Sequence, residues 1–217
     1  MKTFFISVFL TLLINFSLGQ SSTVEFEGKV YYTNSFKIKQ PAIDSNDLIK
    51  SFGSSSIYTY KNGQFIWKSQ GSQFQYEIYN SFSGSLVDKY DDSDTLYKID
   101  IFNKGDSLLS YQIIENADTI CGYNCNAIKV VLQSLTDSSI MKRTIFYSPK
   151  LFINPDYFEN YRSYANYKIY PLTKAVPLRI ITEYDGLPVE ITMNANKVEQ
   201  TNIDDKEFQL DKSLFIK

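Results

Sequence analysis

Histidine is absent from this sequence of 217 residues, and cysteine occurs only twice. Without imidazole, the chain has no Ser-His or Cys-His nucleophile pair, no histidine-ligated zinc or haem, and no side chain whose ordinary pKa lies near neutrality. Net charge is also nearly lacking, because 22 Lys and Arg residues balance 24 Asp and Glu residues to a formal charge of -2. So small a charge gives no overall field that would hold a polyanion. We therefore expect no binding to nucleic acid or to an anionic membrane surface.

One long apolar run lies at the start of the chain. It covers residues 4–14 after a basic start at Lys2, and the small residues Ser17 and Gly19 suit cleavage before Gln20. The run is well short of the ~20 apolar residues that span a bilayer. These features are typical of a cleaved secretory signal peptide.

The remainder of the chain has no apolar stretch of transmembrane length. No cysteine stands directly after the apolar run, where it could accept a lipid anchor. No internal repeat or low-complexity linker divides it. We therefore expect residues 1–19 to be a signal peptide and residues 20–217 to form a single domain. That domain would be periplasmic or secreted, and it would not be membrane-integral.

Alternation of apolar and polar residues with a period of two dominates the mature chain, which is typical of half-buried strands. Two dipeptides, Asn62-Gly63 and Asp185-Gly186, tolerate the positive φ that tight hairpin turns require. In the first strand one face carries Val24, Phe26, Gly28, Val30 and Tyr32. With this strand, about ten are expected, at residues 57–61, 64–69, 73–79, 95–102, 108–114, 126–133, 140–147, 178–184 and 187–193, with 197–203 as an edge strand.

Helical signals are few. Residues 44–52, which end before Gly53, and residues 155–164, which follow Asn154 as an N-cap residue, each predict a short helix. Antiparallel strands with one or two short helices indicate a mainly β (α+β) fold. The expected architecture is a large curved antiparallel sheet with the helices covering one face.

Several short segments carry a resemblance to a known family. They are Phe26-Glu27-Gly28, Tyr60-Lys61-Asn62-Gly63, Thr119-Ile120-Cys121-Gly122-Tyr123-Asn124-Cys125, Val176-Pro177-Leu178 and Phe208-Gln209-Leu210. Together with the leader, they resemble uncharacterised secreted proteins of the Bacteroidota, whose fold is similar to that of periplasmic lipoprotein carriers and outer-membrane lipoprotein receptors. The resemblance implies an incomplete barrel closed by helices, with an apolar cavity that holds a lipid or lipopeptide. No stretch of this chain matches the carriers' own functional residues, so none are carried over.

The two cysteines, Cys121 and Cys125, are separated by three residues able to form a tight turn between strands. In an exported chain a local disulfide is the leading hypothesis, because facing cysteines on antiparallel strands can meet the required separation. Closing so short a loop would stabilise the fold by only about 2 kcal/mol. A free thiol pair and metal or redox chemistry remain alternatives, although two thiols without histidine make an incomplete zinc set.

Aromatic residues are the most suggestive functional feature, with 17 Tyr and 16 Phe. Aromatic side chains suit either a packed core or a cavity for a long apolar ligand, and the sequence favours the core because one face of any sheet must be buried. Residues 151–164 form either a lid over the open mouth of the incomplete barrel or, as we favour, a cap on the core. Within this segment the spacing of Tyr157, Tyr161 and Tyr164 places them on one helical face. The candidate ligand-binding residues are Phe65, Trp67, Phe74, Tyr76, Tyr157 and Tyr161.

No pattern selects catalytic residues. Asp91, Asp92 and Asp94 lie close in a turn, but they lack the glycine and distal glutamate of an EF-hand loop, which favours a solvated turn. A hydrolase acting on envelope glycans would need two carboxylates in a cleft, and the spacing of acidic residues selects no pair. We therefore expect a protein that is not an enzyme and has no cofactor and no metal site. Its expected function is binding of a lipid or lipopeptide; the alternative is an envelope interaction or structural module with a packed core and a protein partner.

Overall fold

Strands make up most of the molecule. The structure is a computed structural model that describes residues 24–40, 43–102, 105–210 and 213–216, so the proposed signal peptide lies outside the described residues. The strands are β1 (Gly28–Ile38), β2 (Ser55–Lys61), β3 (Gln64–Gln70), β4 (Phe74–Asn80), β5 (Ser85–Tyr90), β6 (Thr95–Ile99), β7 (Asp106–Ile120), β8 (Tyr123–Ser134), β9 (Ile140–Phe152), β10 (Ala175–Tyr184), β11 (Val189–Gln200) and β12 (Phe215–Ile216). The helices are α1 (Ser45–Phe52) and α2 (Asn166–Thr173), with 3-10 turns η1 (Pro155–Phe158), η2 (Ser163–Ala165) and η3 (Asp205–Phe208).

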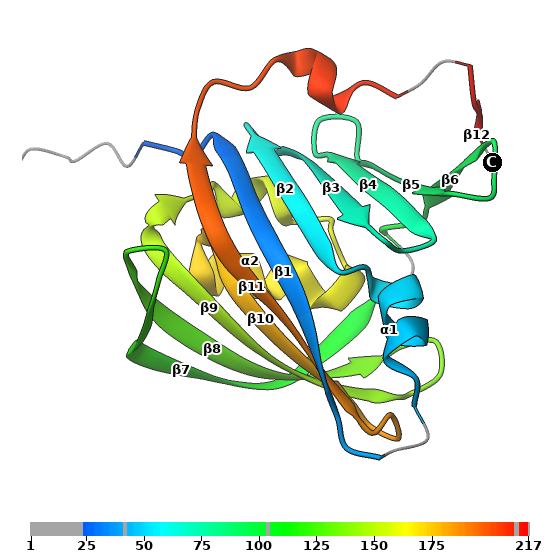
Figure 1. Ribbon diagram of the computed structural model, residues 1–217. Coiled ribbons are helices and arrows are strands. Elements are labelled where there is room, and N and C mark those ends of the chain that lie inside the picture. The colour runs from blue at the N-terminus through cyan, green and yellow to red at the C-terminus, as the bar shows by residue number, and fades with distance from the viewer. Residues whose placement is uncertain (1–23, 41–42, 103–104, 211–212, 217) are drawn as a thin grey trace, which may run out of the picture.

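All these strands belong to one sheet, in the order β12-β6-β5-β4-β3-β2-β1-β11-β10-β9-β8-β7. Neighbours are antiparallel except β12, which is parallel to β6. The sheet is strongly curved but not closed, and η1, η2 and α2 lie against its concave face (Figure 1). The predicted fold class is therefore confirmed: the protein is a mainly β, incomplete barrel with short covering helices. Among the described residues, no helix has the length and apolar character needed to cross a membrane.

One pair of consecutive strands is widely separated in the sheet. β6 and β7 follow each other in sequence but lie near opposite edges of the sheet. From Ile99 at the end of β6 to Asp106 at the start of β7 the chain can span at most about 25 Å. Ile101, in this link, is 1% exposed. The length of the link therefore limits how far apart the end of β6 and the start of β7 can lie.

The strand predictions hold best where turns are tight. Asn62 and Gly63 both have positive φ, 45° and 74°, so the predicted hairpin between β2 and β3 is present. The prediction of an edge strand at residues 197–203 is wrong. Residues 189–200 form one strand in the middle of the sheet, because β1 and β10 pair with it on both sides. β5 and β12 were not predicted.

The predicted helix over residues 155–164 is also wrong. Asn154 does accept a hydrogen bond from the N–H of Asp156, as an N-cap residue should, but the helical turn ends at Phe158. Tyr164 has a φ of 55°, and the α-helix begins only at Asn166. Packing decides this, because Phe158 and Tyr161 are both drawn into one aromatic cluster. The real helix was missed because Pro171 lies inside it, where proline normally disfavours helix.

Phe158 is the centre of that aromatic cluster. Its fully buried ring lies 4.0 Å from the ring centre of Tyr170 and 5.6 Å from that of Tyr79. The rings of Tyr60 and Phe65 follow at 6.3 and 6.5 Å. Such aromatic pairs contribute roughly 0.5–1.5 kcal/mol each beyond the burial of area. The cluster attaches the segment between β9 and β10 to strands β2, β3 and β4.

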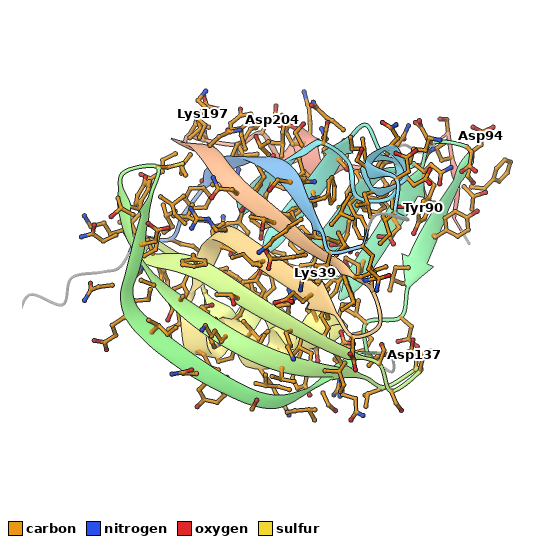
Figure 2. The ribbon with its side chains drawn as sticks, turned by 60° about the horizontal axis from the view of Figure 1, so that its bottom comes forward. Lys39, Tyr90, Asp94, Asp137, Lys197 and Asp204 are labelled. Carbon is orange, nitrogen blue, oxygen red and sulfur yellow. The ribbon has the colours of Figure 1, made fainter. Side chains whose placement is uncertain are left out.

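The C-terminal strap, residues 201–210, crosses the convex face of the sheet. Ile203 and Phe208 are buried there against Ile66 and Ile78. Lys61 anchors the strap by an ion pair with Asp205 at 2.7 Å and a hydrogen bond to the carbonyl of Ile203. Charged residues project from the rim of the molecule, including Asp94, Asp137, Lys197 and Asp204 (Figure 2).

We expect Phe158→Ala to lower the free energy of unfolding by about 3–5 kcal/mol, because it leaves a cavity among stacked rings. The control is Phe82→Ala, since Phe82 is 69% exposed and its ring meets only Tyr157 within the described aromatic contacts. That change should cost less than about 1 kcal/mol. Urea unfolding measures both, and equal losses would contradict the central role of Phe158.

Candidate functional site

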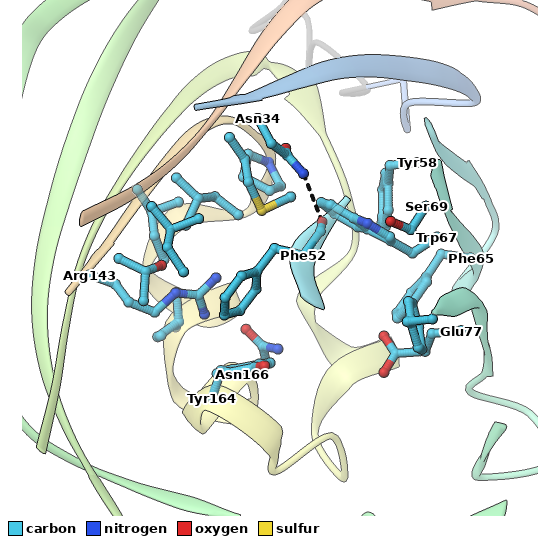
Figure 3. A pocket seen from close by; sticks show the side chains of 18 of the residues that line it. Asn34, Phe52, Tyr58, Phe65, Trp67, Ser69, Glu77, Arg143, Tyr164 and Asn166 are labelled. Atoms are coloured by element: carbon cyan, nitrogen blue, oxygen red, sulfur yellow. Dashed lines mark hydrogen bonds between the residues drawn. The ribbon is translucent and has the colours of Figure 1, made fainter. Parts of the chain in front are cut away.

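A cavity of about 470 Å³ lies between the concave face of the sheet and the segment that contains η2 and α2 (Figure 3). Its walls come from β2 to β5 on one side and from β9 to β11 on the other. Most of the lining is apolar or aromatic. It includes Tyr58, Phe65, Trp67, Phe74, Ile180 and Met193.

Four of the six candidate ligand-binding residues line this cavity: Phe65, Trp67, Phe74 and Tyr161. Trp67 is half-buried, and its ring lies 5.2 Å from that of Tyr32, with which it is stacked. The alternation along β3 and β4 thus places the rings of Phe65, Trp67 and Phe74 on the concave face. Tyr164, which shares no helical face with Tyr161 in the structure, also lines the cavity.

Tyr76 and Tyr157 lie outside the cavity lining. Phe74 and Tyr76 are two residues apart, but the register of β4 against β5 shifts between them, so they face opposite sides of the sheet. Tyr76 packs on the convex side with Ile66 and Phe208 under the strap. Tyr157 is half-buried, and its ring contacts Phe82.

Strands β4 and β5 present an acidic pair to the cavity. Glu77 and Asp88 are direct partners across β4 and β5, and both line the cavity. The hydroxyl of Tyr161 donates to Oε1 of Glu77 at 3.1 Å. Burial, with the nearby charge of Asp88, raises the pKa of Glu77 to about 8. Burial also raises the pKa of Asp88 to about 6, so the pair holds about one proton at neutral pH.

The sequence alone does not indicate this pair, because period-two alternation over residues 73–79 places Glu77 with Gln73 and Gln75 on the polar face of a strand. The strap covers the convex side, so Ile78 is buried and Tyr76 half-buried there, and Glu77 points inward. One signal was available. A hairpin loop at residues 81–84 places Asn80 opposite Ser85 and therefore Glu77 opposite Asp88.

Arg143, from β9, lines the wall across the cavity from Glu77 (Figure 3). Its guanidinium carbon lies 4.7 Å from the ring centre of Tyr164. Its Nε is buried without a hydrogen-bond partner. Asn34, at the edge of the cavity, donates to the carbonyl oxygens of Phe52 and Gly53 at 2.9 and 3.1 Å and so ties the end of α1 to β1. The lining of the cavity is thus mostly apolar, with an acidic pair on one wall and a guanidinium on the other.

The two cysteines are free in the structure, with Cys121 exposed and Cys125 buried. The predicted three-residue turn between facing cysteines is wrong. Cys121 and Gly122 form the turn themselves, with φ of 50° and 79°, and Ile120 pairs with Tyr123. Cys125 therefore faces Asp118 across the ladder instead of Cys121.

Asp91, Asp92 and Asp94 are all exposed in the turn between β5 and β6. In the part of the chain that the structure describes, no group of three or more acidic, cysteine or histidine side chains is placed to hold a metal ion.

Comparison with known protein families finds no match for the chain, and no curated protein matches it.

We expect the two thiols to differ in reactivity. Exposed Cys121 should react within minutes with a thiol reagent such as 5,5'-dithiobis(2-nitrobenzoic acid), and buried Cys125 only on unfolding. Burial raises the pKa of both thiols, so neither should be unusually reactive at neutral pH. Cys121→Ser should remove the fast phase. If the unsubstituted protein shows no titratable thiol after denaturation, the two cysteines form a disulfide, which would contradict this prediction.

The acidic pair makes stability depend on pH. Above the unfolded pKa of Glu77, near 4.5, the unfolded chain releases protons that the folded protein keeps up to about pH 8. The contribution of Glu77 to the free energy of unfolding should therefore be greatest below about pH 5 and fall as the pH rises towards 8. Glu77→Gln should flatten this fall.

Glu183→Gln serves as the matched control. A hydrogen bond from Lys39 lowers the pKa of Glu183, so its contribution to the pH dependence of stability has the opposite sign to that of Glu77. Urea unfolding of the three proteins at several pH values measures the slopes. A Glu77→Gln slope equal to that of the parent protein would contradict a proton held on Glu77.

Proposed function

We propose that this protein binds an apolar or amphipathic ligand, a lipid or lipopeptide, in the cavity of the incomplete barrel. The observation that carries the proposal is the cavity of about 470 Å³ with its predominantly aromatic and aliphatic lining. Ligand cavities in proteins typically measure about 300–1,000 Å³ and combine an apolar lining with a few placed polar groups.

The aromatic wall supplies the binding energy. Trp67 and Phe74 are only half-buried, so part of each ring remains available to a ligand. Each square ångström of apolar surface removed from water contributes roughly 25 cal/mol. Rings held by neighbours, as Trp67 is by Tyr32 and Tyr58, lose little freedom on binding.

The resemblance to periplasmic lipoprotein carriers and outer-membrane lipoprotein receptors supports the same proposal, since those proteins hold acyl chains in an incomplete barrel. In this proposal the mature protein is exported and acts in the cell envelope. Its segment between β9 and β10 forms one wall of the cavity, because Tyr161 and Tyr170 both line it.

A catalytic function is not part of the proposal. Two neighbouring carboxyl groups are present at Glu77 and Asp88, but the cavity around them is lined mainly by aromatic and aliphatic side chains. A sugar substrate would need many hydrogen-bonding groups along a cleft. We therefore assign the acidic pair to the wall of a binding site.

The only tryptophan of the chain, Trp67, lies in the cavity wall and can report occupancy. We expect the neutral apolar dye N-phenyl-1-naphthylamine to bind, with energy transfer from Trp67. Ile180→Phe, which narrows the cavity, should weaken binding by at least about tenfold, or ~1.4 kcal/mol. Ile113→Phe is the matched control, because Ile113 is 43% exposed on β7 and does not line the cavity.

Native mass spectrometry of protein purified without detergent, followed by lipid extraction, should reveal a bound lipid or lipopeptide. A delipidated sample that takes up no dye and carries no lipid would refute the proposal. That result would favour an interaction module with a dry interior.

A further inference from the structure

Among the described residues that line the cavity, Arg143 is the one with a cationic side chain. In the described ladder it faces Val130 on β8 and Thr182 on β10, so neither neighbouring strand offers it a carboxylate. Within the described residues no acidic group lies within ion-pair distance of its guanidinium. Asp106, which is close enough to feel its charge, instead accepts the backbone N–H of Tyr164 at 2.5 Å.

The surroundings of Arg143 leave its hydrogen-bonding capacity unused. Its Nε is buried and has no partner, and one face of the guanidinium lies over the ring of Tyr164. A guanidinium carries five N–H donors in a planar fork that matches a carboxylate or phosphate. An unpaired charge and an unsatisfied buried donor are both costly, so an anion from outside the chain would stabilise this group.

The acidic pair cannot serve as the missing partner. Glu77 and Asp88 stand on β4 and β5, which six and seven steps of the sheet order separate from β9, so they lie on the opposite wall. Figure 3 shows Arg143 and Glu77 on either side of the cavity, with the ring of Phe52 between them and Trp67 on the same side as Glu77, its direct partner across β3 and β4. A ligand headgroup on Arg143 would thus leave its apolar part directed at the aromatic wall.

We propose, on the basis of the function proposed above, that the cavity selects an amphiphile with a single anionic headgroup, a carboxylate or phosphate, which binds to Arg143 while its hydrocarbon chain lies against Trp67 and Phe65. The ring of Tyr164 holds the guanidinium in position by its cation-π contact. The acidic pair disfavours a second negative group at the far end of the ligand. This arrangement selects a single-headed anion over a neutral or a doubly charged lipid.

The experiment compares dansyl-labelled undecanoic acid with its methyl ester, which lacks the negative charge and carries one extra methyl group, using energy transfer from Trp67. A lysophosphatidic acid of similar chain length, added as a competitor, separates phosphate from carboxylate headgroups. The native protein should bind the acid about 10- to 100-fold more tightly than the ester, the range expected for hydrogen bonds to a charged group. Arg143→Gln should remove that preference, and Arg143→Lys should restore part of it.

Lys142→Gln is the matched control, because Lys142 is the exposed neighbour of Arg143 on β9. It should leave the preference for the acid unchanged. The comparison in the native protein does not depend on the folding of any variant. Equal affinities for acid and ester, with N-phenyl-1-naphthylamine still bound, would overturn the role of Arg143 and leave the proposed function standing. Tighter binding of dodecylamine than of the acid would also overturn it and would point to Glu77 and Asp88. Loss of all binding would refute both proposals.

Discussion

The structure depends on how one segment fills the concave face of the sheet. Between β9 and β10 the chain forms η1, η2 and α2 instead of a tight turn. At one end Phe158 packs among rings from β2, β3 and β4, and at the other Ile169 packs with Ile128 and Val130 of β8. The same segment therefore holds the two arms of the sheet at a fixed separation. The cavity is the space that this segment does not fill.

The polar groups of the cavity follow from the same geometry. Strands on opposite arms of the curved sheet face each other across the interior, so Glu77 and Asp88 on one arm lie across from Arg143 on the other. Neither group is neutralised by direct pairing, because the filling segment keeps the arms apart. Burial instead shifts the pKa values of the two acids upward. The interior is thus a low-polarity space with a guanidinium on one wall and an acidic pair on the other.

Much of the fold could be predicted from the sequence, because strand alternation and tight turns are local. Phe26, Val30 and Tyr32 share a buried face as expected, and Asn62-Gly63 makes its hairpin. Non-local contacts explain the failures. Nothing near Glu77 reveals that the C-terminal strap covers the convex face and turns Tyr76 outward. Nothing near Phe158 reveals the rings that end its helical turn. For the site, alternation placed Phe65, Trp67 and Phe74 together, but Arg143 had no local signal.

The pairing of β1 with β11 has a consequence for the order in which the sheet can assemble. β1 pairs with β2 soon after it in the chain, but its other edge pairs with residues 189–200, close to the far end. A chain emerging from the ribosome N-terminus first therefore holds that edge of β1 open until residues 189–200 have been delivered. Pairings between residues so distant in sequence are slow to form, and an open strand edge invites wrong partners in the meantime. The strand that joins the two arms in the finished protein is thus the segment most in need of protection while the protein is being made.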